Sequence, residues 1–201
     1  MIGNGPKPMR LLTLLLVTIP LLAADELTVY DLLAPETHEF AIIYDVSATR
    51  EGAPYYLNPI RHGSVAEKER VVDRATGQEL KFDVITGKAA KAEGIGPNAA
   101  DDDEFLRVHL LKPVAKGSET RIRIYKTYTD AASYSEKNRT LVWQRPLGIK
   151  RNVVILPRGY ELIGSASPSI VSTDPDGRIR LSFLNDRDDQ LPVKITARRI
   201  Q

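Results

Sequence analysis

The sequence contains no cysteine among its 201 residues. Disulfide frameworks, thiol nucleophiles, cysteine-ligated metals and a lipid-anchored N-terminal cysteine are therefore excluded. A chain of this length can bury a core large enough to be stable without cross-links. Exported eukaryotic domains often carry disulfides, so the absence of cysteine favours a bacterial source.

The sequence also lacks an apolar run long enough to cross a bilayer. Its longest largely apolar stretch covers residues 11–22, whereas a spanning helix needs about 20 residues. Lys7 and Arg10 precede this stretch, and Ala23 and Ala24 follow it. That order is typical of a secretory signal peptide. We therefore expect residues 1–24 to form a signal-peptide helix that is cleaved. The mature chain would then have no transmembrane span and would be periplasmic or extracellular. An uncleaved signal anchor is the alternative.

No excess of one charge sign remains once this leader is removed. The whole chain has 28 Lys and Arg against 26 Asp and Glu, and residues 1–24 hold two of the bases and none of the acids. The mature chain is therefore formally neutral, with both signs interspersed. Because nucleic-acid binders usually carry a basic stripe, we do not expect a nucleic-acid partner.

Motifs of catalysis and nucleotide binding are missing as well. The chain has no G-x-S-x-G elbow, no phosphate-binding P-loop and no G-x-G-x-x-G turn. Residues 37–40 fail the H-E-x-x-H zinc pattern, so a role without catalysis is favoured. The alternative is a small hydrolase with a cleft built from acids and histidines. Its candidate residues are Asp101, Asp103, Asp186, His38, His62 and His109.

The pattern that dominates the mature chain is alternation of apolar and polar residues, which indicates half-buried strands. In residues 38–46, for example, Phe40, Ile42 and Tyr44 share one face. Similar segments recur at 80–85, 105–111, 121–125, 141–143, 153–156, 179–183 and 193–197. The sequence therefore predicts an all-β fold: an antiparallel β-sandwich of two packed sheets with about ten or more strands. We expect one domain over residues 25–201, with a possible internal seam near residues 145–150.

Several local features refine this prediction. Turn residues at 74–78 and 173–178 each predict a hairpin between neighbouring antiparallel strands. Residues 65–73 match a helix capping box, but Val71 and Val72 directly before a turn favour a strand. Residues 87–104 indicate a long surface loop with room for one helical turn. In residues 80–85 we expect Leu80, Phe82 and Val84 to point inward.

Aromatic side chains provide one candidate binding site. Tyr125, Tyr128, Tyr134 and Trp143 fall close together in the sequence. Exposed aromatic faces on a β-sandwich can stack on sugars or peptides. The competing interpretation is that Trp143, the only tryptophan, fills the core.

Acidic loops provide a candidate metal site. Residues 101–104 close the long loop, and residues 185–189 link the last two expected strands. Calcium prefers six to eight oxygen ligands, so Asp101, Asp103, Asp186 and Asp188 are candidate calcium ligands. The alternative is a pair of solvated loop tips, because the full EF-hand spacing is absent from both.

Two stretches of the chain bear a resemblance to known β-proteins. Residues 152–162 and 176–185 resemble segments of exported bacterial β-proteins, and their strand rhythm is similar to that of the non-catalytic β-domain preceding the catalytic domain of gluzincin aminopeptidases. The resemblance implies a β fold and no site residue, because the zinc-binding helix of those enzymes is absent. We expect an exported, non-catalytic module that binds a protein or glycan in the cell envelope or outside the cell. A secreted hydrolase and a calcium-stabilised structural protein are the alternatives.

Overall fold

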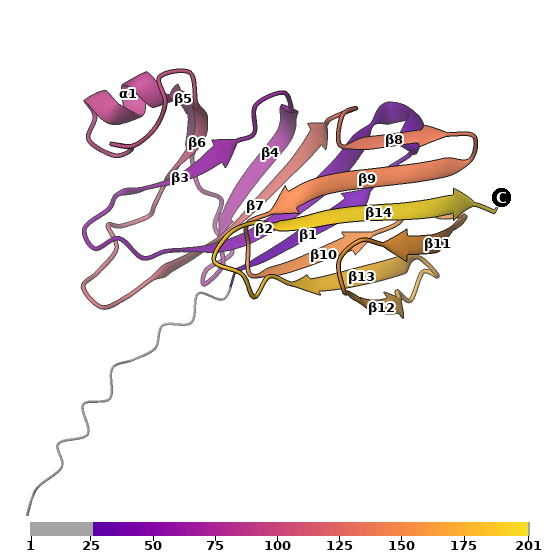
Figure 1. Cartoon of the computed structure of the whole chain (residues 1–201). Coiled ribbons are helices and arrows are strands. Elements are labelled where there is room, and N and C mark those ends of the chain that lie inside the picture. Colours follow the sequence, from indigo (N-terminus) through magenta and orange to yellow (C-terminus); the bar gives the residue numbers. More distant parts are fainter. Residues whose placement is uncertain (1–25, 201) are drawn as a thin grey trace, which may run out of the picture.

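The computed structural model describes residues 26–200, and these form a nearly all-β protein with three packed sheets (Figure 1). The expected signal peptide, residues 1–24, lies outside the described residues. No helix among residues 26–200 is both long and apolar enough to cross a membrane. The all-β prediction is confirmed, but the expected two sheets are three, and one pair of neighbouring strands is parallel rather than antiparallel.

The largest sheet has seven strands, and its centre pairs the first strand of the described chain with a strand from the last third of the sequence. Strand β1 pairs on one side with β2 in antiparallel fashion and on the other with β10 in parallel. The seven strands in order are β12 (Ile170–Thr173), β13 (Ile179–Leu184), β10 (Arg151–Ile155), β1 (Leu27–Leu32), β2 (Glu39–Ala48), β7 (Thr120–Thr129) and β4 (Val65–Asp73).

A four-stranded sheet covers part of one face of this sheet. Its strands in order are β11 (Tyr160–Ser165), β14 (Leu191–Arg199), β9 (Thr140–Leu147) and β8 (Tyr134–Lys137). Residues 148–150 carry the chain from β9 in this sheet to β10 in the seven-stranded sheet. The possible seam near residues 145–150 therefore lies where the chain passes between two packed sheets.

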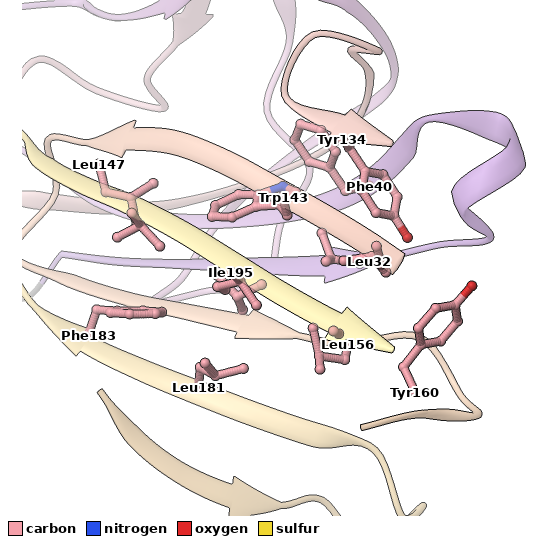
Figure 2. Close-up of a cluster of buried hydrophobic side chains, with 14 of the residues drawn as sticks. Leu32, Phe40, Tyr134, Trp143, Leu147, Leu156, Tyr160, Leu181, Phe183 and Ile195 are labelled. Atoms are coloured by element: carbon pink, nitrogen blue, oxygen red, sulfur yellow. The ribbon is translucent and has the colours of Figure 1, made fainter. Parts of the chain in front are cut away.

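The larger hydrophobic cluster, here called the sandwich core, fills the space between these two sheets (Figure 2). The Trp143 ring of β9 lies 5.1 Å from that of Tyr30 and 6.2 Å from that of Phe40, measured between centroids. Phe40 comes from β2, so both layers contribute aromatic rings. Such tilted and edge-to-face ring pairs stabilise a core beyond the area they bury.

A three-stranded sheet packs on the same face of the seven-stranded sheet, toward its β7–β4 end. Its order is β3 (Tyr55–Ile60), β6 (Glu104–His109) and β5 (Phe82–Thr86), and Figure 1 shows it beside the helix α1 (Gly87–Ala92). A second hydrophobic cluster, here called the side core, lies beneath it. Leu106 and Val108 of β6 meet Ile122 and Ile124 of β7 there.

Several local predictions can be compared with these elements. The hairpin at 173–178 joins β12 to β13 as expected, and Gly177 supplies its positive φ of 83°. Residues 65–73 form β4, so the strand interpretation is confirmed. The turn at 74–78 is present, but the residues on its two sides are joined only by an isolated bridge between Val72 and Glu79. The next strand, β5, belongs to the three-stranded sheet. The prediction that this turn joins two neighbouring antiparallel strands is therefore wrong.

The inward orientation expected for β5 is only partly correct. Leu80 is buried in the side core, but Phe82 and Val84 are exposed. They stand opposite Val108 and Leu106 in the ladder and so share their face. Because β5 is the edge strand, the rest of residues 26–200 covers its apolar face only in part.

The helix α1 opens the segment expected to be a loop. The Thr86 side chain caps it by accepting a hydrogen bond from Ala89 N at 3.2 Å. Gly87 lies against the end of the same segment: a Cβ there would sit 1.7 Å from the backbone oxygen of Ala100. The loop from Gly94 to Asp103 can therefore close on the helix only because residue 87 has no side chain.

We predict that Gly87→Ala lowers the free energy of unfolding by about 1–3 kcal/mol, because the loop backbone must move to admit the methyl group. Urea denaturation followed by circular dichroism measures the change. Gly164→Ala is the matched control, since a Cβ at that position meets nothing within 4 Å and the backbone is not left-handed. Equal stability of both variants and the wild type would contradict the prediction.

Candidate functional site

The four aromatic candidates do not form one exposed platform. Tyr134 and Trp143 are fully buried in the sandwich core, and Tyr128 is buried beside them. Tyr125 lies on the opposite face of β7, half-buried, with the Arg70 guanidinium 5.3 Å from its ring centroid. A ligand at the surface therefore has at most one of these rings to stack on.

The acidic candidates lie on two different loops. Asp101 pairs with Lys91 of α1, and Asp103 accepts a hydrogen bond from Ala100 N at 2.7 Å. Asp186 and Asp188 lie between β13 and β14. Within residues 26–200, no group of three or more histidine and carboxylate side chains is placed to hold a metal ion. Calcium binding stays a prediction, because these acidic residues do not form a preformed cluster of ligands within residues 26–200.

The histidines are each engaged separately. His62 Nε2 lies 3.2 Å from Asp103 on the surface, and His109 Nε2 lies 2.8 Å from Asp83. His38 Nδ1 is 2.8 Å from the backbone oxygen of Tyr134. Of the acids and histidines proposed for a hydrolytic cleft, the structure brings together only His62 and Asp103. Neither lines any of the four pockets described in this structure.

One large pocket, of about 620 Å³, lies at the end of the sandwich near Pro35. Three arginines line it, and carboxylates of the same chain engage each of them. Arg178 contacts Asp31 at 2.5 Å and Asp176 at 2.7 Å. Its hydrogen bond to Asp31 is the main cause that raises the pKa of Arg178, and its hydrogen bond to Asp176 adds to the effect. Arg158 pairs with Asp176, and Arg199 pairs with Glu36 and Glu136. The pocket's positive charge is thus already balanced, which favours a structural role.

A pocket of different character lies beside β12, at one edge of the seven-stranded sheet. It measures about 600 Å³ and is mainly apolar, lined by Ile170, Leu184, Val153 and Leu27 among others. Ile170 is 74% exposed, and Leu184 is also exposed. We call this surface, together with the free edge of β12, the β12 groove. Large exposed apolar patches of this kind mark interaction sites.

The segment before β12 is held in place by side-chain hydrogen bonds. The Ser167 hydroxyl donates to Pro192 O at 2.5 Å, and the Ser165 hydroxyl donates to Ser167 O at 2.8 Å. These bonds tie the β11–β12 connection to β14. Pro168, which lines the groove, is thereby positioned before any partner binds.

β12 differs from the other sheet edges among residues 26–200 in carrying no charge, proline or bulge. The other edge strands among residues 26–200 all carry charges, a proline or a bulge, which are devices that block strand addition. β4 holds Glu67, Lys68, Glu69 and Arg70 with a break in register, β11 holds Glu161 with a bulge, β8 holds Glu136 and Lys137, β3 holds Pro59 and β5 holds Asp83. β12 reads Ile-Val-Ser-Thr. The sequence showed this uncharged segment but could not show that it lies at an edge.

Comparison with known proteins gives a fold and no family. No protein-family model and no curated protein matches the chain. Among solved structures, an M1 zinc metallopeptidase from Deinococcus radiodurans is similar, with a TM-score of 0.52 and 11% identity. A mutant of such a metallopeptidase from the same organism, bound to a Tyr-Ser-Ala substrate, matches with a TM-score of 0.52 and 10% identity. Each match covers 86% of this chain but only 41% of the other, and at this identity the likeness shows a shared fold alone.

Proposed function

We propose that this protein is an exported, non-catalytic binding module that captures an extended segment of a partner protein along β12. In strand addition, a peptide extends the sheet by pairing with the backbone of its edge strand, and alternate side chains enter neighbouring pockets. The single observation that carries the proposal is the uncharged edge of β12, without proline or bulge, directly beside the apolar groove.

The dimensions of the site suit a short extended segment. β12 is paired only with β13, through Ile170–Ser182 to Thr173–Ile179, and its outer edge faces away from the sheet. Four residues of strand extend about 13 Å, at about 3.3 Å per residue. Such a short template provides few backbone hydrogen bonds, so side chains of the partner in the β12 groove must supply much of the affinity.

A protein partner is favoured over a glycan by the aromatic side chains. Sugar binding of the kind considered above needs an exposed ring, and the rings of Tyr128, Tyr134 and Trp143 are buried. The lining of the β12 groove is instead mainly apolar, with Arg151 and Asp186 as its charged residues, and its aliphatic side chains suit the alternate residues of an apolar strand. Location outside the cytoplasm follows from the leader-like residues 1–24 and is part of the proposal.

Ile170→Lys is the variant that tests this function. We expect it to lower the recovery of the partner from an envelope extract at least tenfold, because a lysine on the edge strand blocks pairing and adds charge to the groove. Val84→Lys is the matched control: it adds the same charge at a residue that is 55% exposed on β5. Recovery should stay within twofold of the wild type with that control.

The recovered protein must then be shown to bind at β12. Hydrogen exchange of the purified pair should show new protection of the backbone amides of residues 169–173. Protection confined to other strands, or equal recovery with Ile170→Lys and Val84→Lys, would overturn the proposal.

A further inference from the structure

A separate cavity of about 190 Å³ lies where the three sheets meet. Residues of β1, β2 and β7 line it, together with Asn58 of β3 and Arg145 of β9. Along β7 it separates the two hydrophobic clusters: Ile124 belongs to the side core, Tyr128 to the sandwich core, and Lys126 lies between them. We call this space the seam cavity. It is on the opposite face of the seven-stranded sheet from the β12 groove.

The seam cavity holds a buried cation that forms no ion pair, although the Glu69 carboxylate is near enough to interact with it electrostatically. Lys126 is only 8% exposed, and its Nζ donates to Asn58 Oδ1 at 2.6 Å and to the Tyr128 hydroxyl at 3.2 Å. Both partners are neutral, and no ion pair joins Lys126 to a carboxylate within residues 26–200. An ammonium has three donors, so one N–H of Lys126 is left for a further acceptor. A buried charge without a charged partner is costly, which makes it a marker of function.

The hydroxyls of Thr28 and Tyr128 are two further possible donors in the lining of the seam cavity. Thr28 is 3% exposed, and its hydroxyl has no hydrogen-bond partner within the described chain. The Tyr128 hydroxyl accepts from Lys126 Nζ and from Arg61 N at 3.4 Å, so its own proton is free to donate. No acidic side chain lines the cavity. Donors and a cation therefore converge on a space that offers them no anionic acceptor.

We propose that the seam cavity binds a small carboxylate with a short apolar body. The charge to be matched is a single one, because Asp130 already pairs with Arg145 at 2.8 Å and Arg61 is exposed at the rim. A carboxylate would accept hydrogen bonds from the third N–H of Lys126 and from Thr28. Its apolar body would contact Ile42 and Ile149.

The size of the cavity limits the ligand. A space of about 190 Å³ suits an acid with a short branched chain. The entrance lies at Pro59, Arg61 and Ile149, which are the more exposed residues of the lining. The proposal does not depend on strand addition at β12, because the two sites lie on opposite faces of one sheet.

The ionisation of Lys126 makes binding dependent on pH. Burial lowers the pKa of Lys126 to about 8, so its charge is present at pH 7 and lost by pH 10. Burial raises the pKa of Tyr30 to about 12 and raises those of Tyr44 and Tyr128, so these hydroxyls stay protonated in that range. The charged groups around the ammonium are Arg61, Arg145, Asp130 and Glu69. We expect the affinity for a carboxylate to fall at least tenfold between pH 7 and pH 10.

Titration with isovalerate, followed by calorimetry and by NMR of the backbone amides, tests the proposal. We expect saturable binding at one site, no binding of the neutral isostere isovaleramide, and weaker binding of inorganic phosphate. Lys126→Met should lower the affinity at least tenfold, and Thr28→Val at least threefold. Lys116→Met, at an exposed loop lysine, and Ile170→Lys, in the β12 groove, should leave it within twofold.

The controls keep a folding defect apart from a binding defect. Methionine fills a similar volume without charge, so Lys126→Met should unfold at a temperature no lower than the wild type. Lack of saturable binding of isovalerate to the wild type would overturn the proposal. So would tighter binding of phosphate than of isovalerate, or unchanged affinity in folded Lys126→Met.

Discussion

Asp130→Ala should lower the free energy of unfolding by about 3–5 kcal/mol, among the largest effects of any single substitution, because it leaves the buried Arg145 guanidinium without its counter-ion. Arg145 Nη1 and Asp130 Oδ2 lie 2.8 Å apart, and both side chains are buried. The guanidinium is also 5.1 Å from the Phe40 ring centroid, so it cannot turn toward water without unpacking the sandwich core. For a chain of this size the midpoint of thermal unfolding should fall by on the order of 10 °C.

Asp130 also organises the turn before β8, which adds to the loss. Its carboxylate accepts hydrogen bonds from Ser133 N at 3.0 Å, from the Ser133 hydroxyl at 2.6 Å and from the Ser64 hydroxyl at 3.2 Å. Burial alone would raise the pKa of Asp130, but the Ser133 hydrogen bonds and Arg145 outweigh it and lower the pKa below 3.8. This stability is therefore present above pH 3.8 and is lost as the pH falls through the lowered value.

Urea denaturation at pH 7 and at pH 3 tests the loss of stability in Asp130→Ala and its dependence on pH. The gap in stability between wild type and Asp130→Ala should be widest at pH 7 and should narrow at pH 3. Asp101→Ala is the control, because its ion pair with Lys91 is exposed and should be worth no more than about 0.5 kcal/mol. A loss below about 1 kcal/mol for Asp130→Ala would show that Arg145 is solvated in some other way.

Trp143→Ala should cost about 3–5 kcal/mol for a different reason, the cavity left in the sandwich core. The side chain is 0% exposed and packs against the rings of Tyr30 and Phe40, which both come from the seven-stranded sheet. Trp143→Phe should cost only about 1 kcal/mol, because it keeps an aromatic ring and removes an indole N–H that has no partner within the described chain. The variants lack tryptophan, so unfolding must be followed by circular dichroism rather than by fluorescence. Similar losses for the two variants would contradict this packing.

The sequence was informative wherever local periodicity and burial agree. Phe40, Ile42 and Val46 alternate with residues of the outer face in β2, and all three are buried in the structure. The Asp-Gly step at 176–177 predicts the β12–β13 hairpin because a left-handed residue is required within that turn. These features depend on neighbours in the sequence, and they could be read without the fold.

Features that depend on distant partners could not be read in this way. The exposure of Val84 arises from the edge position of β5, and the parallel pairing of β1 with β10 has no turn signature. Both candidate sites are of this type. Lys126 stands in an alternating strand like any surface lysine, and only the arrival of β3 and β9 from distant parts of the chain buries it. The sequence shows that Tyr128, Tyr134 and Trp143 lie close together along the chain. Their burial on the inner faces of β7, β8 and β9 could not be predicted without knowing how the sheets pack.

The position of β1 at the centre of the largest sheet sets the order in which the molecule can be completed. The strand ending at Leu32 can pair with β2 early, but its other edge stays open until Arg151–Ile155 has been synthesised. Closing so long a stretch of chain is slow compared with forming a hairpin. The seven-stranded sheet therefore cannot be completed until the last third of the chain has been made.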